Sequence, residues 1–185
     1  MKQNLLRRNL WNTAGKAGLA LGGVSAAFLF ISHALTGVVL PGFISSLLNF
    51  ALWAGKFGGC IWLMMFFMKR FVTENPEAGN STTYRLGMAS AFLSALIYAA
   101  VSFADVAFIS ADMYSETMDM VMQQMGSFMD SNTSAAMETM FERLPQYMFF
   151  SNLIYCFLYG TVLSFILSRS IPSRNPFADY KPEDQ

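Results

Sequence analysis

Charged side chains are scarce in this sequence of 185 residues: they make up 13% of it, against about 25% in an ordinary soluble domain. The 12 lysines and arginines equal the 12 aspartates and glutamates in number, so the chain lacks the cationic surplus that nucleic-acid binders need. Two cysteines and one histidine exclude a disulfide framework, a four-ligand zinc site and a histidine-based metal cluster.

Hydrophobic residues are abundant instead. They make up 54% of the chain and include 18 phenylalanines, a composition that excludes disorder for most of its length. No side chain from Ala17 to Gly55 is charged, and this stretch is long enough for one membrane-spanning helix of about 20 residues and the start of a second. A turn at Pro41-Gly42 separates them. In all, the apolar runs predict four spans: Ala17–Val39, Leu47–Met68, Leu86–Ile109 and Tyr147–Ser168.

The predicted fold is therefore all-α, an integral membrane four-helix bundle with a short amphipathic helical hairpin between spans three and four. Residues 1–171 form one four-span domain that includes an outer segment at 110–146, and the proline-containing residues 172–185 form a disordered cytoplasmic tail. Basic residues precede span one as in a secretory signal, but its apolar run exceeds the ~7–15 residues of a signal core, so we expect a retained anchor. The arm before it, with Leu6, Leu10 and Trp11, is either part of this anchor or an interfacial helix.

The distribution of lysine and arginine predicts an orientation. Outside the spans these residues concentrate in the N-terminal arm, in the loop between spans two and three, and in the tail, whereas the opposite side offers only Arg143. Cytoplasmic segments are enriched in lysine and arginine, so we expect a multi-pass inner-membrane protein with both termini in the cytoplasm. The segment 110–146, which is acidic, then lies on the outer side of the membrane.

More than half of the 14 methionines fall between Met113 and Met140. Four of them recur at spacings of four, three and four residues, which places them on one face of a helix: Met118, Met122, Met125 and Met129. A second short helix follows the turn at Asp130 and is stopped by Pro145. We expect these helices to form a hairpin that lies on the outer membrane surface or caps the bundle, with a methionine face that packs or binds a partner.

Copper binding is the sharper alternative for this segment. The string Met118-x-Met120-x-Met122 resembles methionine-rich sequences that bind Cu(I), because a thioether is a soft ligand. On a helix, however, Met120 points away from the other two, and the segment contains neither histidine nor cysteine. We therefore predict no metal site and no cofactor.

Ionisable residues inside spans are costly, and they are functional candidates for that reason. Three are present, His33, Lys56 and Asp105, and all three fall in the outer half of the predicted bilayer. Polar residues also form a stripe along span three (Ser94, Tyr98, Ser102, Asp105) and another along span four (Asn152, Tyr155, Tyr159). We hypothesise an intramembrane polar cluster of His33, Lys56, Asp105, Asn152 and Tyr155, in which Lys56 pairs with Asp105. The alternative is that Lys56 extends toward the headgroups and Asp105 lies at the interface.

Small residues recur at every fourth position of each span and predict close helix–helix seams, and we expect some of these seams to serve a second copy of the chain. They are Ala14, Gly18, Gly22 and Ala26; Gly55 and Gly59; Gly87, Ala91, Ala95 and Ala99; and Gly160, Ser164 and Ser168. The two cysteines, Cys60 and Cys156, lie within spans and are interpreted as packing residues.

The layout resembles the domain of unknown function 4199 family of small four-span bacterial membrane proteins. The resemblance rests on Trp11–Gly23 opening span one, Phe66–Arg70 closing span two, Tyr84–Gly87 entering span three, and the outer methionine- and glutamate-rich segment. It implies an inner-membrane protein of unassigned activity and supplies no catalytic residue.

No phosphate loop, serine elbow or zinc-protease motif is present in the sequence, so we predict no enzyme. The first functional hypothesis is a non-enzymatic accessory or scaffold subunit whose partners are the lipid bilayer and another membrane protein or a second copy. The alternative is a small oligomeric transporter or channel that uses the polar cluster.

Overall fold

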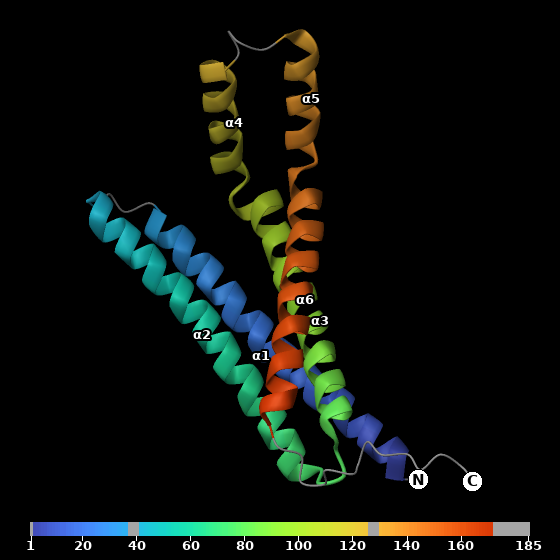
Figure 1. The fold of residues 1–185 in the computed structure, drawn as a ribbon. Coiled ribbons are helices and arrows are strands. Elements are labelled where there is room, and N and C mark those ends of the chain that lie inside the picture. Colours follow the sequence, from blue (N-terminus) through green and yellow to red (C-terminus); the bar gives the residue numbers. More distant parts are fainter. Residues whose placement is uncertain (1, 37–40, 126–129, 172–185) are drawn as a thin grey trace.

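The computed structural model describes residues 2–36, 41–125 and 130–171, and in these ranges the chain is almost entirely helical. Four long helices form a bundle: α1 (Lys2–Thr36), α2 (Gly42–Glu74), α3 (Asn80–Ala104) and α6 (Leu144–Ser170). Between α3 and α6 the chain forms a π-helical turn and two shorter helices: η1 (Asp105–Ile109), α4 (Ala111–Met125) and α5 (Ser131–Glu142). The prediction of an all-α four-helix bundle with a helical hairpin between the third and fourth long helices is confirmed (Figure 1).

The four long helices are each long and apolar enough to cross a membrane. The segments that could cross a membrane contain 27 to 33 residues and are therefore about 40–50 Å long. They extend beyond a hydrocarbon core, which is about 30 Å thick. The N-terminal arm is part of this extension: α1 is continuous from Lys2, and Leu6 and Leu10 pack against the buried core. The arm is thus a continuation of the first span and not a separate interfacial helix.

The core is concentrated at the end of the bundle that carries Lys2, Glu74 and Ser170, here called the basal end. Phe71, Met68 and Leu86 are among its largest fully buried side chains. Helix α2 ends before Pro76, because the residue before a proline disfavours the helical conformation. The side-chain amide of Asn75 donates to the carbonyl of Phe71 at 3.0 Å and accepts from Asn9 at 3.2 Å, which fixes the short α2–α3 connection against α1.

Helix α3 is central, and glycines let its neighbours approach it closely. A Cβ atom at Gly18 or Gly22 of α1 would lie within 3 Å of Leu93 or Ile97 of α3, respectively. On the other side of α3, a Cβ at Gly160 of α6 would lie 2.5 Å from the Cβ of Ala91. The small-residue seams predicted for spans one, three and four therefore exist, and backbone proximity holds these helices together.

Helix α2 is peripheral and lacks such a seam. It packs mainly on α1 and makes few contacts with α3 and α6. A Cβ atom added at its Gly55 would lie 3.5 Å from the ring of Phe28, an ordinary contact, and a Cβ added at Gly59 would have nothing within 4 Å. Gly55 and Gly59 therefore form no close seam within the chain, and the use of this seam by a second copy stays a prediction. Toward the hairpin end of the bundle, opposite the basal end, α2 diverges from α6 (Figure 1).

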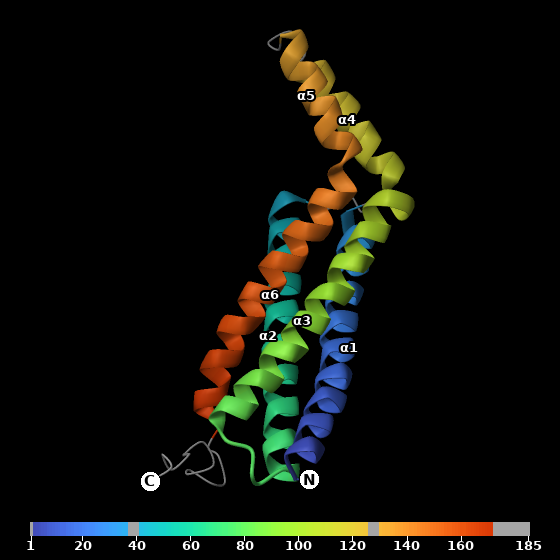
Figure 2. The ribbon, with the colours of Figure 1, turned by 90° about the vertical axis from the view of Figure 1, so that its right-hand side faces the viewer.

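The α4–α5 hairpin extends beyond the four long helices, at an angle to α6 that Figure 2 shows, and does not fold over the bundle (Figures 1 and 2). The expectation that the hairpin caps the bundle is therefore wrong, whereas its placement on the membrane surface stays a prediction. The predicted turn at Asp130 caps α5, since its carboxylate accepts from the backbone N–H of Thr133 at 2.9 Å. Pro145 lies in the first turn of α6, where a proline is tolerated. The predicted disordered tail, residues 172–185, lies outside the described residues.

Candidate functional site

Among the polar contacts that join the long helices, three involve residues of the hypothesised cluster, and the outermost of these is between His33 and Asp105. His33 Nδ1, near the end of α1, lies 3.3 Å from Asp105 Oδ1, and only 1% of the Asp105 side chain is exposed. The hydroxyl of Ser110 donates to the same carboxylate oxygen at 3.0 Å. A nearly buried carboxylate is thus held by an imidazole from one helix and a hydroxyl from its own turn.

The π-helical turn explains how Asp105 and Ser110 meet. The backbone N–H of Ser110 donates to the carbonyl of Asp105 at 2.7 Å, five residues back, where an α-helix would bond four residues back. This wider turn brings the Ser110 hydroxyl to the Asp105 carboxylate. Tyr114 lies in the first turn of the following helix, α4. Burial is the largest cause that raises its pKa, and the negative charge of Asp105 is the second. The polar contact therefore reaches from α1 through η1 to the base of the hairpin.

The second contact joins α3 to α6. The side-chain amide of Asn152 donates to the hydroxyl of Ser102 at 2.9 Å, and the Ser102 side chain is buried. Both residues belong to the predicted polar stripes, and their pairing shows that the stripes of spans three and four face one another at this level. Hydrogen bonds of this kind between membrane helices contribute about 0.6–2 kcal/mol each.

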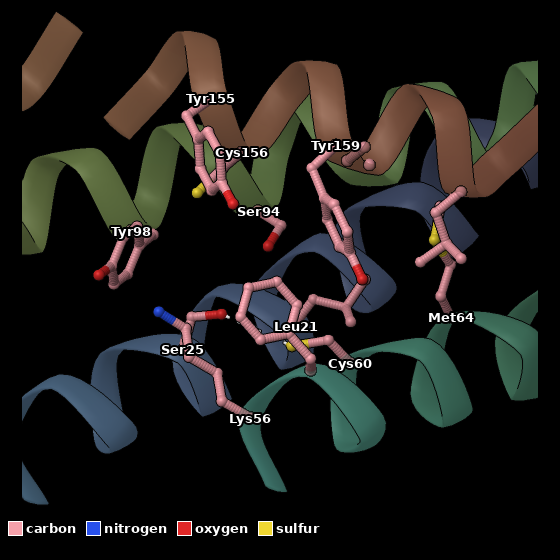
Figure 3. Close-up of a pocket in the computed structure, with 14 residues that line it drawn as sticks. Leu21, Ser25, Lys56, Cys60, Met64, Ser94, Tyr98, Tyr155, Cys156 and Tyr159 are labelled. Carbon is pink, nitrogen blue, oxygen red and sulfur yellow. Dashed lines mark hydrogen bonds between the residues drawn. The ribbon is translucent and has the colours of Figure 1, made fainter. Parts of the chain in front are cut away.

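The third contact lies deeper in the bundle, between α2 and α3. The ammonium of Lys56 lies 4.3 Å from the ring centroid of Tyr98, within range of a cation–π interaction. Figure 3 shows the Lys56 side chain reaching from α2 past Ser25 toward Tyr98. The structure does not join Lys56 to Asp105 as we hypothesised; the ion pairs of the described residues are His33–Asp105 and Arg70–Glu74. The imidazole, which comes from α1, occupies the place that we expected for the lysine.

Lys56 lines a pocket of about 90 Å³ that lies between α1, α2, α3 and α6. Aromatic, hydroxyl and thiol groups line it together with apolar side chains, and no carboxylate is among the lining residues. Figure 3 shows Cys60 on the α2 side and Tyr155, Cys156 and Tyr159 on the α6 side. Ser25 and Cys60 interact at 3.7 Å across the pocket floor. The lining residues are Leu21, Ser25, Lys56, Phe57, Cys60, Met64, Ala91, Ser94, Tyr98, Tyr155, Cys156, Tyr159, Gly160 and Leu163.

The five residues of the hypothesised cluster are therefore distributed over separate contacts. His33 lies with Asp105, Asn152 lies with Ser102, and Lys56 shares the pocket with Tyr155. Tyr155 is at the rim, because 61% of its side chain is exposed. Tyr98 and Ser102, which contact Lys56 and Asn152, belong to the polar stripe that the sequence predicted along span three. No spacing in the sequence indicated that Ser110 would bind Asp105 or that the two cysteines would line the pocket.

The predicted methionine face begins on α4 as expected. Met118 and Met122 lie on this helix and are half-buried, Met125 is its last residue, and Met129 lies outside the described residues. Met113 and Met120 of the same helix are more exposed, with 41% and 57% of their side chains accessible, and Met140 of α5 exposes 49%. The described residues contain no group of three or more His, Cys, Asp or Glu side chains arranged to hold a metal ion.

Four helices that are long and apolar enough to cross a membrane, packed around a small and largely apolar pocket, indicate an all-α multi-pass membrane protein. Comparisons of the chain with protein-family models, with curated proteins and with solved structures find no match.

Proposed function

We propose that this chain is a non-enzymatic accessory or scaffold subunit of the bacterial inner membrane, with both termini in the cytoplasm, and that its α4–α5 hairpin binds another membrane protein. The observation that carries the proposal is the separation of the hairpin from the bundle (Figure 1). Helix α4 contacts mainly η1, and α5 contacts mainly α6, so each packs on the element next to it in the chain. Exposed methionines on both helices form an adaptable apolar surface that suits a partner.

The charge of the hairpin indicates the chemistry of this partner. Asp112, Glu116 and Asp119 are exposed on α4, and Glu138 and Glu142 are exposed on α5. A protein that presents apolar side chains bordered by lysine or arginine complements this surface. A second copy of the hairpin would bring like charges together, which favours a different protein as the partner. The four-span layout with this methionine-rich segment also supports our proposal that the chain belongs with the domain of unknown function 4199 family.

Site-specific photocrosslinking in native membranes tests the proposal. A photoreactive amino acid replaces Met120 on the hairpin, or Leu19 on α1 as the control, because Leu19 is 68% exposed and faces away from the core. We expect one discrete adduct from position 120, with a membrane protein whose outward surface is basic, and no adduct from position 19. Reversing the charges of Asp112, Glu116 and Asp119 to lysine should abolish the adduct. An adduct of the chain with itself alone, or one insensitive to charge reversal, contradicts the proposal.

A small oligomeric transporter or channel is the second candidate, favoured by the three polar contacts at successive levels of the bundle. Lys56 would attract a small anion. Uptake of radiolabelled chloride into proteoliposomes tests this function: saturable uptake that is lost in Lys56→Met supports it, and uptake equal to that of protein-free liposomes contradicts it.

A further inference from the structure

Lys56 is a membrane-embedded cation without a counter-charge in the described residues. No carboxylate among them lies within 4 Å of its ammonium, which faces the ring of Tyr98. It lies about 20 Å along α2 from both Gly42 and Lys69, so it is near the middle of the helix. A charged side chain at this depth is costly, and such residues pair with an opposite charge or mark a ligand pathway. The aromatic ring supplies part of the stabilisation and leaves the positive charge available to an anion.

The surroundings of Lys56 favour an anion. Ser25 and Ser94 are among the lining residues, and their hydroxyl groups can donate hydrogen bonds. Because no carboxylate lines the pocket, nothing in the wall repels a negatively charged head group. The pocket thus combines one cation and several neutral donors with largely apolar walls.

The size of the pocket restricts what it can hold. Its volume of about 90 Å³ is smaller than the ~150 Å³ cavity that accommodates benzene, so it accepts a small head group and excludes an alkyl chain. A chain attached to that head group must therefore lie outside the pocket. A bulky phosphodiester head group with two acyl chains is too large, whereas a carboxylate is compact enough.

Helices α2 and α6 make few contacts with each other, so a chain can leave the pocket between them. The rings of Phe57 and Tyr159, 5.2 Å apart, join the two helices beside the pocket. Toward the hairpin end α2 and α6 diverge, and Tyr155 and Trp53 are 61% and 57% exposed there (Figure 1). An alkyl chain leaving the pocket on this side meets apolar side chains and lipid.

We infer that the pocket binds a single-chain amphiphile with a carboxylate head, the carboxylate pairing with Lys56 and the chain leaving between α2 and α6. The exposed aromatic side chains of Trp53 and Tyr155 flank the chain where it enters lipid. This binding site is independent of the hairpin and of the partner proposed for it.

Binding of tritiated laurate to the purified protein in nanodiscs of neutral phosphatidylcholine tests the inference. We expect saturable binding that weakens at least about ten-fold in Lys56→Met and changes by less than about three-fold in Lys56→Arg, which keeps the cation. Lys69→Met is the matched control, since this lysine is exposed on the same helix outside the pocket, and it should bind as the wild type does. Equal binding by the wild type and Lys56→Met overturns the inference.

Competition identifies the head group. We expect unlabelled laurate to displace the tritiated ligand at lower concentration than either dodecanol or dodecyl phosphate. Displacement by dodecanol at the same or lower concentration would mean that the charge is not recognised, and the same result with dodecyl phosphate would overturn the choice of a carboxylate.

Photolabelling of the wild-type protein gives a result that does not depend on the folding of any variant. A laurate analogue with a diazirine on the part of the chain next to the carboxylate should label peptides that contain Trp53 of α2 or Tyr155 of α6. Labelling confined to other helices, or labelling that excess laurate does not suppress, overturns the inference.

Discussion

The imidazole Nδ1 of His33 lies 3.3 Å from the carboxylate Oδ1 of Asp105, and this contact ties the end of α1 to the first residue of the π-helical turn. The same turn leads directly into α4, so the contact stabilises the point where the hairpin leaves the bundle. Asp105 is 1% exposed and His33 is 28% exposed, which makes the carboxylate the partner that depends more on the contact.

Replacing His33 by alanine should destabilise the protein by about 1–3 kcal/mol. Of the two side chains that contact the buried carboxylate of Asp105, only Ser110 would remain. The free energy of unfolding, measured by titration with a denaturing detergent in mixed micelles, checks this value. Asp112→Ala is the control, because this carboxylate is exposed on α4 and the ion pair of His33 is with Asp105.

A double-mutant cycle separates the contact itself from other effects of each substitution. If His33 and Asp105 stabilise each other, the destabilisation by His33→Ala with Asp105→Ala is smaller than the sum of the two single effects. Additive effects of the two substitutions contradict a direct interaction.

Gly160→Ala should destabilise the bundle by about 1–3 kcal/mol, the usual effect of overpacking. The added Cβ would lie 2.5 Å from the Cβ and 3.4 Å from the Cα of Ala91, and neither atom is at the end of a flexible side chain. Helices α3 and α6 would have to separate. Gly23→Ala is the matched control, since nothing lies within 4 Å of its added Cβ, and it should be neutral or stabilising by up to about 1 kcal/mol. Thermal unfolding of both variants in one detergent tests the contrast, and equal melting temperatures contradict it.

The fold was largely predictable because membrane helices are encoded by long local apolar runs. The spans, the hairpin and the seams at Gly18, Gly22 and Gly160 all follow from residue type and spacing along one helix. The lack of a seam at Gly59 was not predictable, since small residues show where close approach is permitted and not which helix uses the space.

The pairing of the polar side chains depends on the rotation of each helix about its axis, which residue spacing does not determine. Lys56 and Asp105 were expected to pair on the basis of opposite charge and similar depth. In the structure, the π-helical turn directs Asp105 toward His33 of α1, while Lys56 on peripheral α2 turns to Tyr98. No spacing signal in the sequence marks a π turn, so this change of partner required the three-dimensional structure.

The amino-terminal cap of α5 predicts a pH effect in the hairpin. Hydrogen bonds from Thr133, through its side chain first and its backbone N–H second, lower the pKa of Asp130 from its ordinary value of 3.8. A carboxylate with a lowered pKa in the folded state stabilises that state above its ordinary pKa, and the stabilisation is lost as the pH falls through the lowered value. Amide hydrogen exchange in α5, corrected for its intrinsic pH dependence, should therefore lose protection below about pH 3.8.

Two variants of Asp130 check the cause of this effect. Asp130→Asn keeps an oxygen that can cap the helix but has no carboxylate to titrate, so protection of α5 should not change over this pH range. Asp130→Ala should reduce protection at every pH. A pH-dependent loss that persists in Asp130→Asn would show that another group is responsible.

The orientation of the bundle can be tested with engineered cysteines on its two ends. Ser134 lies on α5 in the hairpin, and Glu77 is exposed in the connection between α2 and α3 at the basal end. With Cys60 and Cys156 replaced by alanine, Ser134→Cys should react with a membrane-impermeant maleimide in intact spheroplasts. Glu77→Cys should react only after the membrane is permeabilised, because the lysines and arginines near the basal end favour its retention in the cytoplasm. Labelling of Glu77→Cys but not of Ser134→Cys in intact spheroplasts would show that the orientation is the reverse of the predicted one. The acidic hairpin would then lie in the cytoplasm, which excludes a partner that binds it from outside.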